Sequence, residues 1–262
     1  MVRPSMRSHP QTSKFARGRH VLTRYGLWTL CVSISYVVAK RLVGFRALRG
    51  MTLVPQDVDR TFLDELPGFT VRRATALEFA RLPGASEFES QAFYECAAQR
   101  GDWCWYVSEG DTIASYGWYA TAPVIAFDDT WIRFSSDFVY MHKGFTLPRY
   151  RGQKLHALGM ARAAIEATER GRRGLISFVE AHNKASLRSV NRLGYRIFGT
   201  CFKLRLPGKT LTFRTRGCAP FGFGLVVEGA PDPELVPAKA PPVGVAGSAA
   251  GKAQAAAPRR RA

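Results

Sequence analysis

The stretch that decides the fold is FTLPRYRGQKLHALGMARAAIEA, from Phe145 to Ala167. It reads as the end of a strand, a basic turn that contains Gly152, and a long helix. Apolar residues recur in the helical part at the spacing of one helix face. These residues are Leu155, Leu158, Ala161, Ala164 and Ile165.

The turn before this helix has the features of an anion site. A helix N-terminus carries amide groups without partners inside the helix, and the helix dipole is positive there. Gly152 lets the backbone approach an anion because it has no Cβ. Arg149, Arg151 and Lys154 add positive charge. We therefore predict that this loop holds a pyrophosphate.

Two motifs resemble the GNAT acetyltransferase superfamily. The first is P-x-Y-R-G at residues 148–152, followed by a helix, and the second is NKASLRSVNRLGY at residues 183–195. That family binds acetyl-CoA with a loop of the pattern Q/R-x-x-G-x-G/A. Arg149 and Gly152 match the first two fixed positions, whereas Lys154 stands at the third.

The resemblance covers roughly Phe69 to Leu206. It implies an α/β sandwich with a mixed, mostly antiparallel twisted sheet, which is flanked by helices and split between its fourth and fifth strands. It also implies acetyl transfer to an amine, with acetyl-CoA or a longer acyl-CoA as co-substrate and no metal. The residues that it places at the cofactor are Phe145, Thr146, Leu147, Arg149, Arg151, Gly152, Gln153, Lys154, Leu155, Asn183 and Ser186.

Simpler interpretations stay open for several of these residues. Asn183 could cap the helix that follows it, as Asn often does. Arg149 and Arg151 could be solvated surface charges. Lys154 could supply charge to a phosphate, or could mark a loop that binds nothing. Tyr195 reads as a core residue.

The proton-transfer groups are less defined than the loop. Many family members use a Tyr seven residues after the Asn as general acid, and here that position is Val190. Glu180, at the end of a predicted strand, is a candidate base that would act through water; the alternative is a surface carboxylate near Arg188. His142 shares a strand face with Tyr140 and is a second candidate base, because its unperturbed pKa is near neutrality. A structural histidine is the alternative there.

The pattern of elements predicts strands that alternate with helices. We expect helices at 76–100, from 155 onward and at 185–193. We expect strands at 69–75, on both sides of a turn at 109–111, and at 131–133, 137–146, 175–180, 195–206 and 211–216.

Charge is distributed unevenly along the 262 residues, which carry a formal net charge of +18. Residues 1–50 hold ten basic and no acidic residues, and residues 229–262 contribute +3, which leaves +5 for the rest. We expect five regions: a disordered basic arm (1–20), a basic amphipathic helix (21–50), a linker (51–68), the acyltransferase domain (69–228) and a disordered Ala/Pro/Gly-rich tail (229–262).

The basic N-terminal region favours an anionic partner. Its uncharged run, Tyr25 to Ala39, has 15 residues and is shorter than the roughly 20 of a membrane span. A helix that lies on a membrane or packs on the domain, a span, and a processed segment are the three interpretations. Nucleic-acid binding ranks last, because the aromatic residues are not interleaved with basic ones.

The five cysteines show no CxxC pair and no Cys/His spacing, so the sequence predicts no zinc site. Their odd number suits a reducing compartment. We expect a cytoplasmic protein with membrane association through residues 21–50. The alternative to an enzyme is a non-catalytic acyl-CoA-binding domain, which Val190 and Lys154 would suit. The acceptor amine cannot be read from the sequence.

Overall fold

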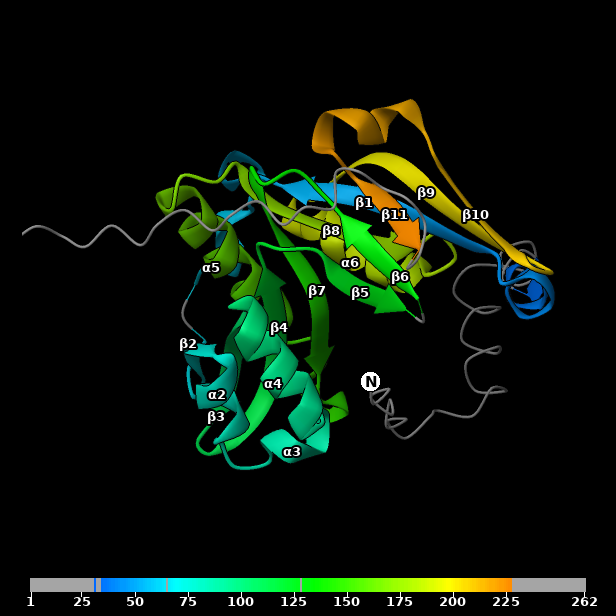
Figure 1. The fold of residues 1–262 in the computed structure, drawn as a ribbon. Coiled ribbons are helices and arrows are strands. Elements are labelled where there is room, and N and C mark those ends of the chain that lie inside the picture. Colours follow the sequence, from blue (N-terminus) through cyan, green and yellow to red (C-terminus); the bar gives the residue numbers. More distant parts are fainter. Residues whose placement is uncertain (1–30, 32–33, 65, 128, 228–262) are drawn as a thin grey trace, which may run out of the picture. The chain divides into compact units, whose positions relative to one another are not determined.

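An eight-stranded sheet forms the centre of this computed structural model, which describes residue 31 and residues 34–64, 66–127 and 129–227. The strand order is β10-β9-β1-β8-β7-β4-β3-β2 (Figure 1). β7 and β8 pair in parallel, whereas the other described pairs of this sheet are antiparallel. The strands are β1 Arg46–Leu53, β2 Thr70–Thr75, β3 Trp103–Glu109, β4 Thr112–Ala120, β7 Phe138–Thr146, β8 Gly174–Glu180, β9 Arg196–Leu206 and β10 Lys209–Arg214.

A smaller sheet and several helices pack on the faces of the main sheet. The smaller sheet has the order β11-β6-β5 and consists of β5 Val124–Phe127, β6 Thr130–Arg133 and β11 Gly224–Val227. The helices are α2 Ala76–Ala80, α3 Ala85–Phe88, α4 Gln91–Arg100, α5 Leu155–Glu169 and α6 Lys184–Leu193, and residues 34–43 are also helical. Short 3₁₀ turns lie at Pro55–Asp57, Arg60–Phe62, Pro148–Tyr150 and Arg216–Phe221. Among the described residues, no helix has the length and apolar character needed to cross a membrane.

Alternation along the strands separates two cores, because successive side chains of a strand point to opposite faces. Val139 of β7 packs with α5, whose buried residues are mostly small: Ala157, Ala161, Ala163, Ala164 and Ala167. Tyr140 belongs to the core on the opposite face, where the small sheet packs. These small residues let α5 lie close to the sheet, and its N-terminal turn therefore lies beside the ends of the central strands.

The main sheet opens between β7 and β8. Within the described chain these strands pair at three positions, from Phe138↔Gly174 to Tyr140↔Ile176. Beyond that point β7 stays paired with β4 as far as Thr146, and β8 stays paired with β1 as far as Glu180. The two strands separate because each follows its other neighbour. β7 and β8 are the fourth and fifth strands of the main sheet counted from Thr70, so the predicted fold class and its split sheet are confirmed.

The predicted helix at 21–50 and linker at 51–68 are wrong where β1 lies. Residues 34–43 are helical, but Arg46–Leu53 form a strand between β8 and β9. Leu48 and Met51 are fully buried in different cores, so β1 has two apolar faces and lacks simple alternation. The domain begins before Phe69, because β1 completes its central sheet.

The other predicted elements are mostly confirmed, with two differences. The segment at 76–100 forms three helices, and the short strands β5 and β11 were not predicted. The predicted strands at 195–206 and 211–216 are present as β9 and β10, which form a hairpin joined across Pro207 and Gly208. The predicted arm at 1–20 and tail at 229–262 lie outside the described residues, as does most of 21–33.

Candidate functional site

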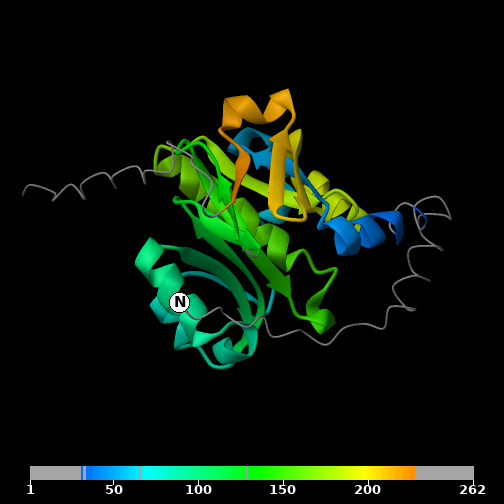
Figure 2. The same cartoon turned by 45° about the vertical axis from the view of Figure 1, so that its right-hand side comes forward.

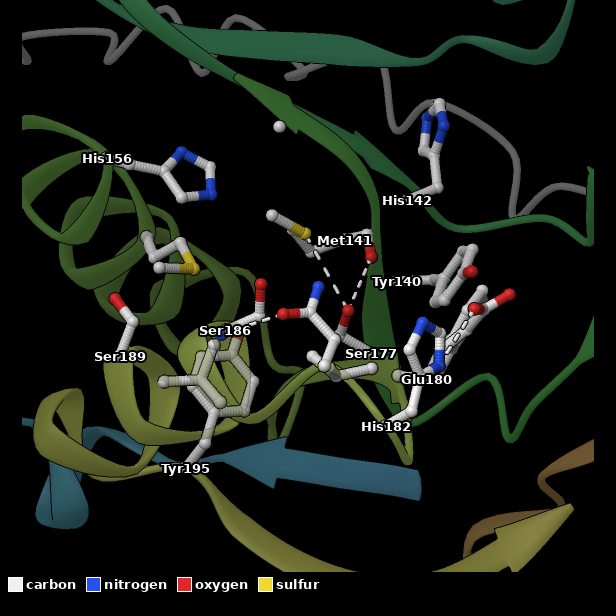
Figure 3. Close-up of a pocket in the computed structure, with 16 residues that line it drawn as sticks. Tyr140, Met141, His142, His156, Ser177, Glu180, His182, Ser186, Ser189 and Tyr195 are labelled. Atoms are coloured by element: carbon white, nitrogen blue, oxygen red, sulfur yellow. Dashed lines mark hydrogen bonds and ion pairs between the residues drawn. The ribbon is translucent and has the colours of Figure 1, made fainter. Parts of the chain in front are cut away.

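The opening between β7 and β8 holds a cavity of about 400 Å³. Figure 3 shows its side chains in two groups, one on each side of β7. His156, Ser186, Ser189 and Tyr195 lie on the side of α5 and α6, and Tyr140, His142, Glu180 and His182 lie on the other. The Ser177 hydroxyl donates to the Met141 carbonyl at 2.8 Å, just where the strands separate. The cavity thus connects the two faces of the sheet.

The basic loop lies between the end of β7 and the first turn of α5. Gly152 has a φ of 86°, and a Cβ there would meet no atom within 4 Å. Lys154 is the N-cap residue of α5, and its side chain makes no capping hydrogen bond. The first amides of α5 therefore have neither an intrahelical acceptor nor a side-chain cap, which suits the binding of an anion. Gln153 and Leu155 flank Lys154 at this point.

Lys154 adopts a backbone conformation that favours glycine. Its φ of 64° is the only positive value at a non-glycine residue in the described part of the chain. The third fixed position of the loop motif thus has a left-handed backbone although it carries a side chain. Its ammonium lies over the ring of Phe62, 5.2 Å from the centroid. Hydrogen bonds from Thr61 lower the pKa of Asp59, and the charge of Lys154 adds a smaller effect in the same direction.

The two arginines of the loop have local contacts. The Arg149 guanidinium lies over the Tyr150 ring, and Nε of Arg151 donates to the Thr146 carbonyl at 3.3 Å. Both arginine residues are exposed. These contacts hold the cations beside the N-terminus of α5 and leave their outer N–H groups toward solvent.

Beyond Tyr140 the end of β7 separates from β8, whereas it stays paired with β4 as far as Thr146. The Leu147 amide donates to the Ala114 carbonyl, and the Phe145 carbonyl accepts from the Ser115 hydroxyl. Thr146 Oγ1 lies 2.9 Å from the same hydroxyl. Contacts to β4 thus hold the three residues that the resemblance places along the cofactor arm.

Glu180 lines the cavity, but its carboxylate is engaged. Its Oε1 accepts from Lys40 at 2.8 Å and from Arg46 at 2.5 Å, and its Oε2 lies 3.3 Å from Nδ1 of His182. Burial acts to raise the pKa of Glu180, but the Lys40 hydrogen bond and the nearby positive charges hold it below its ordinary value. The ionised carboxylate is therefore a weak base. No sequence pattern indicated its partners, which belong to the N-terminal segment.

The imidazole of His142 is held in its neutral form, which is the form that can accept a proton. Its side chain is 6% exposed, and its Nε2 lies 3.4 Å from Oδ2 of Asp102, a fully buried carboxylate that Arg100 also binds. Burial lowers the pKa of His142, and Asp102 partly offsets this. Its Nε2 is buried and faces that carboxylate. The lowered pKa keeps the imidazole neutral at neutral pH.

His156 is a cavity residue that the sequence did not reveal. Gly117 of β4 and Gly144 of β7 face each other in the sheet, and the imidazole lies against both. A Cβ at Gly144 would come within 2.3 Å of His156 Cε1. Burial lowers the pKa of His156 to about 4, although a hydrogen bond to the backbone of Tyr116 acts against this. Two glycines that pair across neighbouring strands would indicate room for a side chain, but the sequence does not show that Gly117 pairs with Gly144.

α6 and the residues that flank it supply further cavity residues. Asn183 caps this helix, because its side-chain oxygen accepts from the Ser186 amide at 3.1 Å. Asn183 and Ser186 nevertheless line the cavity, as does Val190. Tyr195 is buried and also lines it, and its hydroxyl has no hydrogen-bond partner in the described structure. Burial raises the pKa of Tyr195, so its hydroxyl stays protonated.

Comparisons by sequence and by structure give different results. No family model and no curated protein matches the sequence. A Drosophila protein of known structure is 19% identical, with 68% of this chain and 58% of that chain covered and a TM-score of 0.43. A putative GNAT-family acetyltransferase from Novosphingobium aromaticivorans is 16% identical, with 71% and 66% covered and a TM-score of 0.39. The matched region is thus less than two thirds of either protein's length.

A third similar solved structure is a complex with a ligand. AAC(6')-Iy, in complex with the bisubstrate analogue CoA-S-monomethyl-acetylneamine, is 18% identical. The match covers 48% of this chain and 89% of that chain, with a TM-score of 0.37. Solved structures similar to this chain therefore include GNAT acetyltransferases, and the likeness concerns the fold.

Proposed function

We propose that this protein, which has the fold of a GNAT domain, is an acyl-CoA-dependent N-acyltransferase. It transfers an acetyl group from acetyl-CoA to a primary amine by direct attack in a ternary complex. The observation that carries the proposal is the opening between β7 and β8, which places a cavity through the sheet beside an uncapped, basic helix N-terminus. This arrangement offers an anion site on one side of the sheet and room for an amine on the other.

The loop and the start of α5 would bind the pyrophosphate. Amides from Gly152 to Leu155 supply donors, and Arg149 and Arg151 supply charge. The pantetheine arm would then run along Phe145–Leu147 toward the cavity, with Asn183 and Ser186 on its other side. The uncapped first turn of α5 supports this placement because it leaves backbone amides available, and the separation of β7 from β8 beyond Tyr140 agrees with it.

The amine would lie on the side of the cavity that holds His142 and Glu180. The amine nitrogen attacks the thioester carbonyl, a C–N bond forms, and the C–S bond breaks. His142 accepts the amine proton, since it is neutral and buried, whereas Glu180 is already paired with Lys40 and Arg46. The thiolate leaves as CoA and takes up a proton.

Tyr195 would act on the leaving thiolate in place of the tyrosine that is absent at Val190. Its hydroxyl lies on the α6 side of the cavity and has no partner among the described residues. A hydrogen bond to the sulfur would stabilise the charge that develops there. This role is supported by position and by the unused donor.

The test is thiol release from acetyl-CoA by the full chain, measured with a panel of amines that includes polyamines, amino sugars and peptide N-termini. We expect release that depends on both acetyl-CoA and one class of amine. His142→Gln and Tyr195→Phe should each lower it, whereas Arg81→Ala, at the exposed residue that follows α2, should not. Amine-independent release in all variants would contradict the proposed transfer.

Val190 specifically favours a second candidate, a domain that binds acyl-CoA without catalysis. Its side chain lines the cavity where the resemblance expects an acidic hydroxyl. The two functions differ in one result. A binding domain would take up acetyl-CoA with a stable thioester in the presence of every amine, whereas the enzyme would consume it.

A further inference from the structure

The helix at residues 34–43 turns its apolar side away from the domain. Ile34, Val37, Val38 and Leu42 are 54%, 52%, 48% and 78% exposed, and they are four of the nine large apolar side chains exposed in the described structure. An amphipathic helix on a soluble domain usually buries such a face. The exposed face therefore needs an explanation other than packing on the sheet.

This orientation is fixed by polar and aromatic contacts on the other side of the helix. The Tyr36 hydroxyl accepts from the Ala47 amide at 3.0 Å, and the Tyr36 ring stacks on His182 with centroids 4.2 Å apart. Lys40 binds Glu180. The helix is thus docked on the domain through one face while its aliphatic face stays exposed.

A basic cavity lies beside the exposed aliphatic side chains. Figures 1 and 2 show the helix next to the turn between β9 and β10, and residues from both elements line this cavity of about 460 Å³. Leu42 and Leu206, 38% exposed, lie at it. Its cations are Lys40, Arg41, Arg46, Lys203 and Arg205.

Among the described residues, the cavity is lined by cations and by no carboxylate. Lys40 and Arg46 bind Glu180, and Lys203 and Arg205 bind Asp129. Neither of these two carboxylates is one of the described residues that line the cavity. Lys203 is 2% exposed and is also held by Thr130, so the positions of these charges are structurally defined.

We propose that this face binds a membrane that contains anionic phospholipid. The four aliphatic side chains of the helix and Leu206 enter the interfacial region, and a headgroup phosphate lies in the basic cavity. An amphipathic helix with basic residues beside its apolar face is suited to lie in the plane of the interface. Positions 1–50 hold seven further basic residues and no acidic ones, which add attraction to the same kind of surface.

Charge argues against a second copy of the chain on this face. A two-fold contact would bring two identical patches together, each with the same cations. An anionic lipid surface instead offers hydrocarbon for the aliphatic residues and phosphate for the cations. The proposal is independent of acyl transfer, because it uses neither the basic loop nor the cavity between β7 and β8.

The test is co-sedimentation of the full chain with vesicles of phosphatidylcholine alone or with added phosphatidylserine. We expect binding to the phosphatidylserine vesicles that weakens with salt. Arg41→Ala should weaken it about fivefold, as one interfacial charge. A Val38→Ser, Leu42→Ser double variant should abolish most of it. Leu77→Ser, at another exposed apolar site, should leave it unchanged.

Two controls keep the result specific. Circular dichroism melting shows whether each variant folds, and light scattering shows whether the double variant changes the oligomeric state. If the double variant still binds the vesicles, the N-terminal charges alone account for the binding. That result would overturn the proposal for this face. A dimer that the double variant dissociates would also overturn it, as would inorganic phosphate binding to the cavity without any vesicle binding.

Discussion

The Lys40 ammonium lies 2.8 Å from Oε1 of Glu180, and this ion pair joins the helix at 34–43 to the cavity between β7 and β8. Arg46, the first residue of β1, completes the contact. The N-terminal segment therefore does two things in this fold. It supplies a central strand, and it sets the charge state of a cavity carboxylate.

The Lys40–Glu180 pair predicts a pH-dependent loss of stability in Lys40→Met. The pKa of Glu180 is held below its ordinary value of 4.5, so the pair stabilises the fold above that pH and stops doing so as pH falls through the lower folded value. We expect the variant to be less stable by about 1 kcal/mol at pH 7, because Lys40 is partly exposed. The difference should vanish in acid.

Urea denaturation at pH 7 and pH 3 measures this effect. Arg41→Met is the matched control, because Arg41 is the exposed neighbour on the same helix. A loss in Lys40→Met that is equal at both pH values would mean that the packing of its methylene chain, and not its charge, stabilises the fold.

If His142 is the base, its pKa sets the midpoint of the acid limb in the pH profile of kcat/KM. Burial lowers the pKa of His142, so activity should fall with acid at a midpoint below the ordinary value of 6.5. Asp102 acts to raise that pKa, and Asp102→Asn should therefore move the midpoint to still lower pH. His142→Gln should lower kcat by about 10²–10⁴-fold and remove this midpoint. An unchanged midpoint in Asp102→Asn would exclude His142 as the titrating base.

We predict that a side chain at position 144 clashes with His156. In Gly144→Ala the new Cβ would lie 2.3 Å from His156, so we expect a loss of about 1–3 kcal/mol in the free energy of unfolding and reduced activity. Adding His156→Ala should recover part of the stability, because the second change removes the atom that is hit. Chemical denaturation of the two single variants and the double variant measures the coupling. Additive losses would contradict the contact.

The left-handed backbone of Lys154 leads us to predict that glycine at this position stabilises the fold. A left-handed conformation costs a non-glycine residue roughly 1–2 kcal/mol, and glycine's added freedom in the unfolded chain offsets part of the gain. We expect Lys154→Gly to raise the free energy of unfolding by up to about 1 kcal/mol. Lys184→Gly, at the first position of α6, should instead lower it. A thermal melt that falls in both variants would contradict the strain at Lys154.

The local elements around the loop could be predicted because their signals are local. Gly152, the apolar spacing after Leu155 and the proline–glycine turn at 207–208 each indicate structure within a few residues. β1 could not be recognised in this way, because a central strand with two buried faces has no alternation. The resemblance added the split sheet, which no local pattern shows.

The candidate site was predictable in part for the same reason. The loop residues and Asn183 follow a motif; Asn183 lines the cavity, whereas the loop lies at the N-terminus of α5 and is not part of the cavity lining. The partners of Glu180 are 134 and 140 residues away in the chain, so no spacing indicates them. The position of His156 depends on the register that pairs Gly117 with Gly144. Such contacts exist only in the folded sheet.

The most direct measurement is calorimetric binding of acetyl-CoA to the full chain, since a fragment that begins after residue 53 would lack β1. Gly152→Glu should abolish the binding by placing a carboxylate at the predicted pyrophosphate site. Gly84→Glu is the matched control, because Gly84 also has positive φ and open space around it. We predict micromolar binding that is lost in Gly152→Glu and kept in Gly84→Glu. Absence of binding by the unmodified protein, or equal binding by both variants, would contradict the account.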